Sequence, residues 1–137
     1  MHRRMLIADS DGRFLTKAKG VFEEEGFEVC TARDLTAVCL LLEREDFSVV
    51  IVELRLQDIP GEGGASVLLL VTAAAQRTPV IIITDYPSVQ DVRDYLGPNP
   101  HGPPAADLIS KNEGMEVLRA SVRHVVDKRS SPVAVPA

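Results

Sequence analysis

Five short apolar runs, each followed by a helical pattern, constrain the fold of this chain more than any other feature of its sequence. The central runs are continuous rather than alternating, which is typical of strands buried on both faces of a parallel sheet. Because strand and helix alternate five times, the order predicts βαβ units with right-handed crossovers in an α/β domain. The predicted strands cover residues 5–8, 27–30, 49–52, 80–84 and 107–110.

The segments between these runs carry apolar residues at helical spacing. The first is an apolar stripe that starts at Phe14 and stops at Gly26, a residue type that favours helix ends. Asp34 is placed to cap the N-terminus of the second helix. The third, fourth and fifth helices are predicted over residues 65–76, 88–96 and 113–128.

Two segments depart from this alternation. Residues 97–104, "GPNPHGPP", contain four Pro and two Gly, which excludes a helix or a central strand. Residues 129–137, "RSSPVAVPA", have the composition of a disordered tail or the beginning of a linker. We therefore expect one domain over residues 1–128.

The composition argues against several classes of function. A net charge of −5 and a pI near 5.2 argue against nucleic-acid binding by this chain alone. No apolar stretch is long enough for a membrane span or a signal-peptide core. Cys30 and Cys39 lie in apolar context without metal-ligand spacing, which predicts buried, reduced thiols in a cytoplasmic protein.

Polar residues follow the predicted strands at their carboxyl ends. In an open α/β sheet these ends form one edge, where ligands bind. Carboxylates there suit a divalent cation, and a lysine with a hydroxyl suits phosphoryl oxygens. The residues expected at this edge are Asp9, Ser10, Asp11, Glu53, Thr84, Asp85, Ser110 and Lys111.

Four ordered motifs, "LIADSD", "SVVIVELRLQDIPGEGG", "PVIIITD" and "ADLISKN", make residues 4–127 resemble a bacterial response-regulator receiver domain. The resemblance implies a flavodoxin-like (βα)5 fold, with a doubly wound five-stranded sheet in the order 2-1-3-4-5. It implies a signalling module of two-component systems rather than an enzyme, with Mg²⁺ and no organic cofactor. The implied partners are a sensor kinase or a downstream effector. They would dock on the face formed by helix 4, strand 5 and helix 5, which could also form a homodimer.

The departures from the family pattern predict an atypical, pseudo-receiver site. Glu53 stands at the phosphoacceptor position, where its extra methylene moves the carboxylate forward by about 1.5 Å. By the resemblance, Thr84 and Lys111 are the other functional residues, and the implied metal ligands are Asp9, Glu53 and the Arg55 carbonyl. Ser10 replaces the second acidic ligand, so Mg²⁺ binding should be weak or absent. Asp85, Leu108 and Asn112 are further departures, at the positions after the Thr, before the Lys and after it.

Other interpretations stay open at this point. A Mg²⁺-dependent phosphorylation switch could use the same pocket. A small flavodoxin-like enzyme or nucleotide binder is disfavoured, because "ADSDGRF" replaces a glycine-rich phosphate loop after the first strand. Asp11 is expected to be a helix cap, Arg55 a solvated side chain, and His101 and His124 residues without a role in the site.

Overall fold

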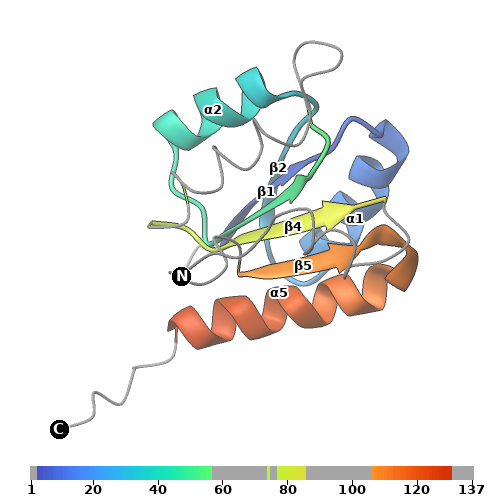
Figure 1. Cartoon of the computed structure of the whole chain (residues 1–137). Helices are drawn as coiled ribbons and strands as arrows, with labels where there is room; N and C mark the ends of the chain where they lie inside the picture. Colours follow the sequence, from blue (N-terminus) through green and yellow to red (C-terminus); the bar gives the residue numbers. More distant parts are fainter. Residues whose placement is uncertain (1–2, 57–73, 75–76, 86–105, 131–137) are drawn as a thin grey trace, which may run out of the picture.

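The computed structural model describes residues 3–56, 74, 77–85 and 106–130 (Figure 1). Five parallel strands form one sheet in the order β2-β1-β3-β4-β5, which confirms the predicted topology. β3 and β4 are buried along their whole length, as their continuous apolar sequences predict. The strands are β1 (Arg4–Ala8), β2 (Glu28–Ala32), β3 (Val49–Glu53), β4 (Val80–Thr84) and β5 (Asp107–Ser110).

The first two helices begin at the predicted caps. The Asp11 carboxylate accepts the backbone N–H groups of Arg13 and Phe14, and the Asp34 carboxylate accepts that of Ala37. These bonds satisfy N–H groups that have no partner within a helix, so each aspartate fixes where its helix starts. The two helices are α1 (Gly12–Glu24) and α2 (Leu35–Arg44).

The last helix begins later than predicted. A 3₁₀ turn, η1 (Lys111–Glu113), precedes α5 (Met115–Ser130), so the predicted start at residue 113 was wrong by two residues. Gly114 separates the two with a φ of 90°, a conformation that other residues adopt only with strain. At the other end, α5 continues two residues past the predicted domain limit at 128.

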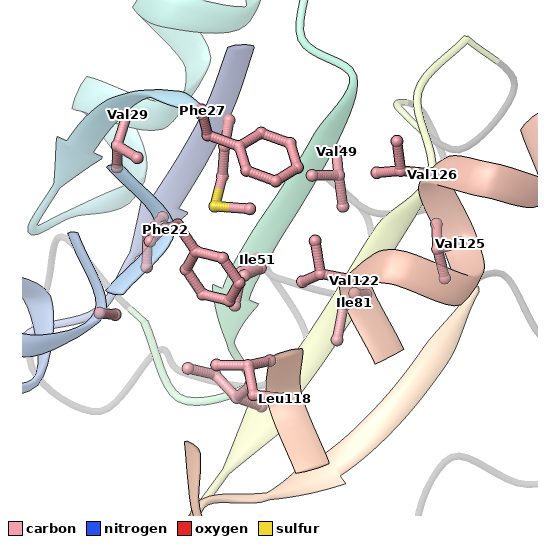
Figure 2. Close-up of a cluster of buried hydrophobic side chains, with 14 of the residues drawn as sticks. Phe22, Phe27, Val29, Val49, Ile51, Ile81, Leu118, Val122, Val125 and Val126 are labelled. Atoms are coloured by element: carbon pink, nitrogen blue, oxygen red, sulfur yellow. The ribbon is translucent and has the colours of Figure 1, made fainter. Parts of the chain in front are cut away.

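The sheet separates two apolar cores. α1 and α5 cover one face, and α2 lies on the opposite face (Figure 1). On the first face Phe22 packs edge-on against Phe27, with ring centroids 6.1 Å apart. Figure 2 shows these rings between β2 and the side chains of β3, β4 and α5. Because both faces are covered, β3 and β4 are buried along their length, whereas the edge strand β2 exposes Glu28 and Thr31.

Several sequence predictions fall partly or wholly outside the described residues. These are the third and fourth helices, the Pro-rich segment 97–104 with His101, and most of the C-terminal segment. The thiol prediction was wrong in its burial: neither Cys30 nor Cys39 is in a disulfide, but Cys30 is half-buried and Cys39 is exposed. In the described part of the chain, no helix combines the length and apolarity that a membrane crossing needs.

Two ion pairs join Glu25, at the end of α1, to α5. The Glu25 carboxylate lies 2.8 Å from the Arg123 guanidinium and 3.5 Å from that of Arg119. Burial works against the Glu25 charge, but the hydrogen bonds and charges of both arginines outweigh it and lower the pKa of Glu25. These ion pairs therefore stabilise the packing of α1 beside α5 while Glu25 is ionised.

Replacing Glu25 should destabilise the fold in a pH-dependent way. The pKa of Glu25 is lower in the folded state, so its contribution is present above the ordinary carboxyl pKa of 4.5 and is lost as the pH falls through the folded value. Glu25→Gln should lower the free energy of unfolding by on the order of 0.5–1 kcal/mol at neutral pH. Urea unfolding measures this, with exposed Glu24→Gln as the control. A loss of equal size in acid would contradict the assignment.

Candidate functional site

The carboxyl ends of β1, β3, β4 and β5 bring the predicted polar residues to one edge of the sheet. Parallel register aligns Ala8, the last residue of β1, with Val52, the residue before Glu53, and it aligns the last residues of β4 and β5, Thr84 with Ser110. Asp9 directly follows β1, and Glu53 ends β3. Both carboxyl side chains are buried, as is Thr84. The edge expected from the sequence therefore exists, and it is largely shielded from water.

Lys111 lies at the centre of this edge. Its Nζ atom is 2.5 Å from Asp9 Oδ2, 3.6 Å from Asp85 Oδ1 and 3.7 Å from Glu53 Oε1. We call these four residues the Lys111 cluster. Asp9 is fully buried and the Lys111 side chain is only 14% exposed, so these charges interact with little screening by solvent.

Glu53 is held by the loop that follows β1. Its Oε2 atom accepts the Ser10 backbone N–H at 3.4 Å and the Ser10 hydroxyl at 3.2 Å. Burial raises the pKa of Glu53 and the charge of Asp9 adds to the rise, while Lys111 and the Ser10 amide act in the opposite direction. The net effect is a raised pKa, because two carboxylates share one buried ammonium.

Lys111 stays charged in this environment. Burial disfavours its ammonium, but the hydrogen bond and charge of Asp9 outweigh burial, and the pKa of Lys111 is raised. The ammonium also lies 4.7 Å from the centroid of the Phe14 ring on α1, a cation–π contact. Lys111 is thus an internal cation, held by carboxylates on one side and by an aromatic face on the other.

A capping box sets the direction of Lys111, and the sequence interpretation missed it. The Ser110 hydroxyl accepts the Asn112 N–H at 3.3 Å, and the Glu113 carboxylate accepts the Ser110 N–H at 3.0 Å. Lys111 is the first residue of the short turn that these bonds close. The letters "SKNE" carry the Ser-x-x-Glu signature that would have revealed it.

Arg33 makes a second connection that the sequence did not reveal. Its guanidinium donates to the Ser10 carbonyl at 3.0 Å and lies over Gly12. The loop after β2 is thereby tied to the loop after β1, and through Ser10 to Glu53. Because Arg33 and Ser10 are 23 residues apart, no local pattern indicates this contact.

The implied Mg²⁺ ligands do not form a fitting donor set. Asp9 directs Oδ2 at the Lys111 ammonium, and its Oδ1 accepts the Asp11 N–H at 2.8 Å. One Glu53 oxygen accepts two bonds from Ser10. In the described parts of the chain, no three His, Cys, Asp or Glu side chains group closely enough to hold a metal ion. The ammonium of Lys111 lies against the oxygens that a divalent cation would need.

The remaining site predictions have mixed outcomes. Asp11 caps α1 as expected. The Arg55 side chain is exposed, so among the described residues it is Lys111, and not Arg55, that neutralises the cluster. Asp85 is 60% exposed yet close to Lys111, which places it at the mouth of the cluster. Leu108 is half-buried on β5. The role of the Arg55 carbonyl as a metal ligand stays a prediction.

Comparisons with known proteins match most of the chain. A family model described as "Response regulator receiver domain" matches residues 5–123. The alginate biosynthesis transcriptional regulatory protein AlgB of Pseudomonas syringae pv. tomato is 25% identical over 126 residues, which cover 92% of this chain and 26% of that protein. The chain thus spans about a quarter of that relative's length.

Solved structures show the same fold. A CheY-like response regulator receiver domain protein from Methanospirillum hungatei JF-1 is 25% identical, with a TM-score of 0.75 over 94% of this chain and 97% of that one. The receiver domain of the Francisella response regulator 1452 is 22% identical, with a TM-score of 0.76 over 94% of this chain and all of that one (100%). The similarity therefore extends over nearly the whole sequence.

Neutralising Glu53 should stabilise the protein at neutral pH. The pKa of Glu53 is raised in the folded state, so its contribution to stability is fully present below the unfolded pKa and is lost as the pH rises through the folded pKa. Glu53→Gln should raise the melting temperature at neutral pH, and by less as the pH falls toward 4.5, the ordinary carboxyl value. Exposed Glu43→Gln is the control. A constant difference at every pH would contradict the assignment.

Removing the central ammonium should be much more damaging. Lys111→Met leaves Asp9 and Glu53 buried without their cation, which should lower the free energy of unfolding by about 3 kcal/mol. Adding Glu53→Gln to this variant should restore part of the loss, because one uncompensated charge disappears. Chemical denaturation of the single and double variants measures the coupling, with exposed Lys19→Met as the control. Strictly additive effects would show that the two side chains do not interact.

Proposed function

The chain belongs to the response regulator receiver domain family, and from this membership we propose that it is a receiver-like interaction module that is not phosphorylated on β3. The observation that carries the proposal is the state of Glu53. Its carboxylate is buried, accepts two bonds from Ser10 and lies 3.7 Å from Lys111. The oxygens that would accept a phosphoryl group are therefore already engaged by the protein.

Phosphoryl transfer to a carboxylate depends on positioning and on neutralising the charge that develops. The extra methylene of Glu53 advances the carboxylate by about 1.5 Å, a bond length. A shift of 1 Å in a reacting group lowers a rate by on the order of 100-fold. Asp85 adds a carboxylate at the mouth of the pocket, where it would repel an anionic donor.

When it is ionised, Glu53 also supplies a negative charge near Lys111 without phosphorylation. In a phosphorylated receiver, the added charge would lie beyond the shorter Asp side chain, in the direction that the longer Glu already extends. We infer that the Lys111 cluster holds this domain in one arrangement without a phosphoryl signal. Leu108, where the family carries an aromatic switch residue, supports the same inference, because a two-state switch needs an element with two positions.

Signalling would then depend on a fixed surface that contacts another protein. We place that surface on the face of β5 and α5, together with the segment of the predicted fourth helix. β5 is an edge strand of the sheet, and Val117 on α5 is 40% exposed. A sensor kinase, a downstream effector or a second copy of the chain would dock there.

The test is intact-mass analysis after incubation with acetyl phosphate and Mg²⁺. We expect the wild-type protein to gain no mass, while Glu53→Asp gains one base-labile phosphoryl group if Glu53 alone silences the site. Glu53→Gln is the matched control, because it keeps the length of Glu and removes the nucleophile.

A base-labile phosphoryl group on the wild-type protein would overturn the proposal and show a working phosphorylation switch. Wild-type modification that persists in Glu53→Gln would place the acceptor outside β3, which would overturn the inference that the domain works without a phosphoryl signal but not the statement about Glu53. If neither the wild type nor Glu53→Asp gains mass, the proposal stands, and Ser10 and Asp85 contribute to the silencing.

A further inference from the structure

A small cavity lies beside the Lys111 cluster, on the face of the sheet that α1 and α5 cover. Its volume is about 110 Å³. The walls come from α1, the ends of β4 and β5, and the first turn of α5. Its lining is mainly apolar, with a lysine from each side: Phe14, Lys17, Ile83, Ile109, Lys111 and Met115.

The size of the cavity limits what it can hold. An apolar protein cavity of about 150 Å³ accepts a benzene molecule, which has six carbons. In proportion, about 110 Å³ accommodates about four carbons. A branched four-carbon group, such as an isobutyl tail, matches both this volume and the apolar walls.

The lining has one exposed cation. Lys17 is exposed, and none of the ion pairs in the described parts of the chain includes it. Arg13, one turn earlier on α1, is also exposed. Lys111, by contrast, is engaged with three carboxylates. A ligand with a carboxylate next to its tail would place that group beside Lys17.

We propose that this cavity binds a free, short, branched-chain carboxylic acid, with the tail between α1 and α5 and the carboxylate on Lys17. The proposal goes beyond the proposed function, because it gives the domain a small-molecule ligand. It does not depend on whether Glu53 accepts a phosphoryl group.

Lys111 connects this cavity to the cluster. Its side chain lines the cavity, while its ammonium contacts Asp9, Glu53 and the Phe14 ring. Phe14 also lines the cavity, so a ligand tail would pack against the ring that faces the ammonium. Binding should therefore alter the surroundings of Glu53, although the ligand does not touch it.

The experiment is an NMR titration of the labelled protein, residues 1–137, with 3-methylbutanoate. Acetate lacks the tail, and 3-methylbutan-1-ol lacks the charge. We expect saturable shifts at the amides of Phe14, Lys17 and Met115, and a shift of the Glu53 carboxyl carbon. The affinity should exceed that for acetate by about tenfold or more, because the tail leaves water. The alcohol should also bind more weakly than the acid.

Two variants test the two halves of the site. Lys17→Gln should weaken binding of 3-methylbutanoate several-fold and leave the alcohol unaffected, while Lys19→Gln, on the same helix but outside the lining, should change neither. Met115→Phe should fill the cavity and abolish binding of both. If Met115→Phe does not fold, the comparison of Lys17→Gln with Lys19→Gln still decides.

Four outcomes would overturn the proposal. The first is an equal effect of Lys17→Gln and Lys19→Gln on the binding of 3-methylbutanoate, because the carboxylate would then not lie on Lys17. A further one is the absence of saturable shifts at the lining residues. Another is equal affinity for acetate and 3-methylbutanoate, because the cavity would then hold no tail. The last is tighter binding of acetyl-Leu-Glu-amide, a blocked dipeptide whose leucine carries the same isobutyl group, than of 3-methylbutanoate. The occupant of the cavity would then be a protein segment rather than a free acid. None of these results affects the mass measurement on Glu53, so the two proposals fail separately.

Discussion

The ion pair between Lys111 and Asp9 is the contact on which the carboxyl edge of the sheet depends. Asp9 is fully buried, and an isolated carboxylate in that position would be strongly disfavoured. The ammonium 2.5 Å away makes its burial possible, and the capping box after β5 aims that ammonium inward. Because the Lys111 ammonium already neutralises part of the negative charge at this edge, the second carboxylate, that of Glu53, is tolerated there.

The departures that the resemblance predicts form a connected set. Ser10, where the resemblance implies an acidic residue, donates its hydroxyl and its amide to the Glu53 carboxylate. A hydrogen-bond donor at this position adds no negative charge beside Glu53. Arg33 secures the same loop from outside. Reverting Glu53 alone would leave Ser10 without its present acceptor, so the substitutions are expected to act together rather than independently.

Most of the described fold was predictable because the central strands β1, β3 and β4 are buried on both faces. Their continuous apolar runs are visible in the sequence, and Asp11 and Asp34 identify the starts of two helices through local bonds. The exceptions are also instructive. The start of α5 was misplaced because a helical pattern from Glu113 onward does not distinguish a 3₁₀ turn from the helix that follows. Cys39 has apolar neighbours in the sequence but is exposed, because successive residues of a helix point in different directions and only some of them face the core.

The sequence by itself determined the alternation of strands and helices and which residue types follow the strands, because hydrophobic periodicity and helix caps are local properties of the chain. The strand order was implied by the resemblance to the receiver family rather than by these local patterns. Only the tertiary structure decided how those residues pair. Lys111 joins Asp9, Glu53 and Asp85 from distant segments, and Phe14 completes its surroundings from α1. Contacts between side chains that are distant in sequence depend on packing geometry and on shielding from water. Neither can be predicted from a short stretch of sequence.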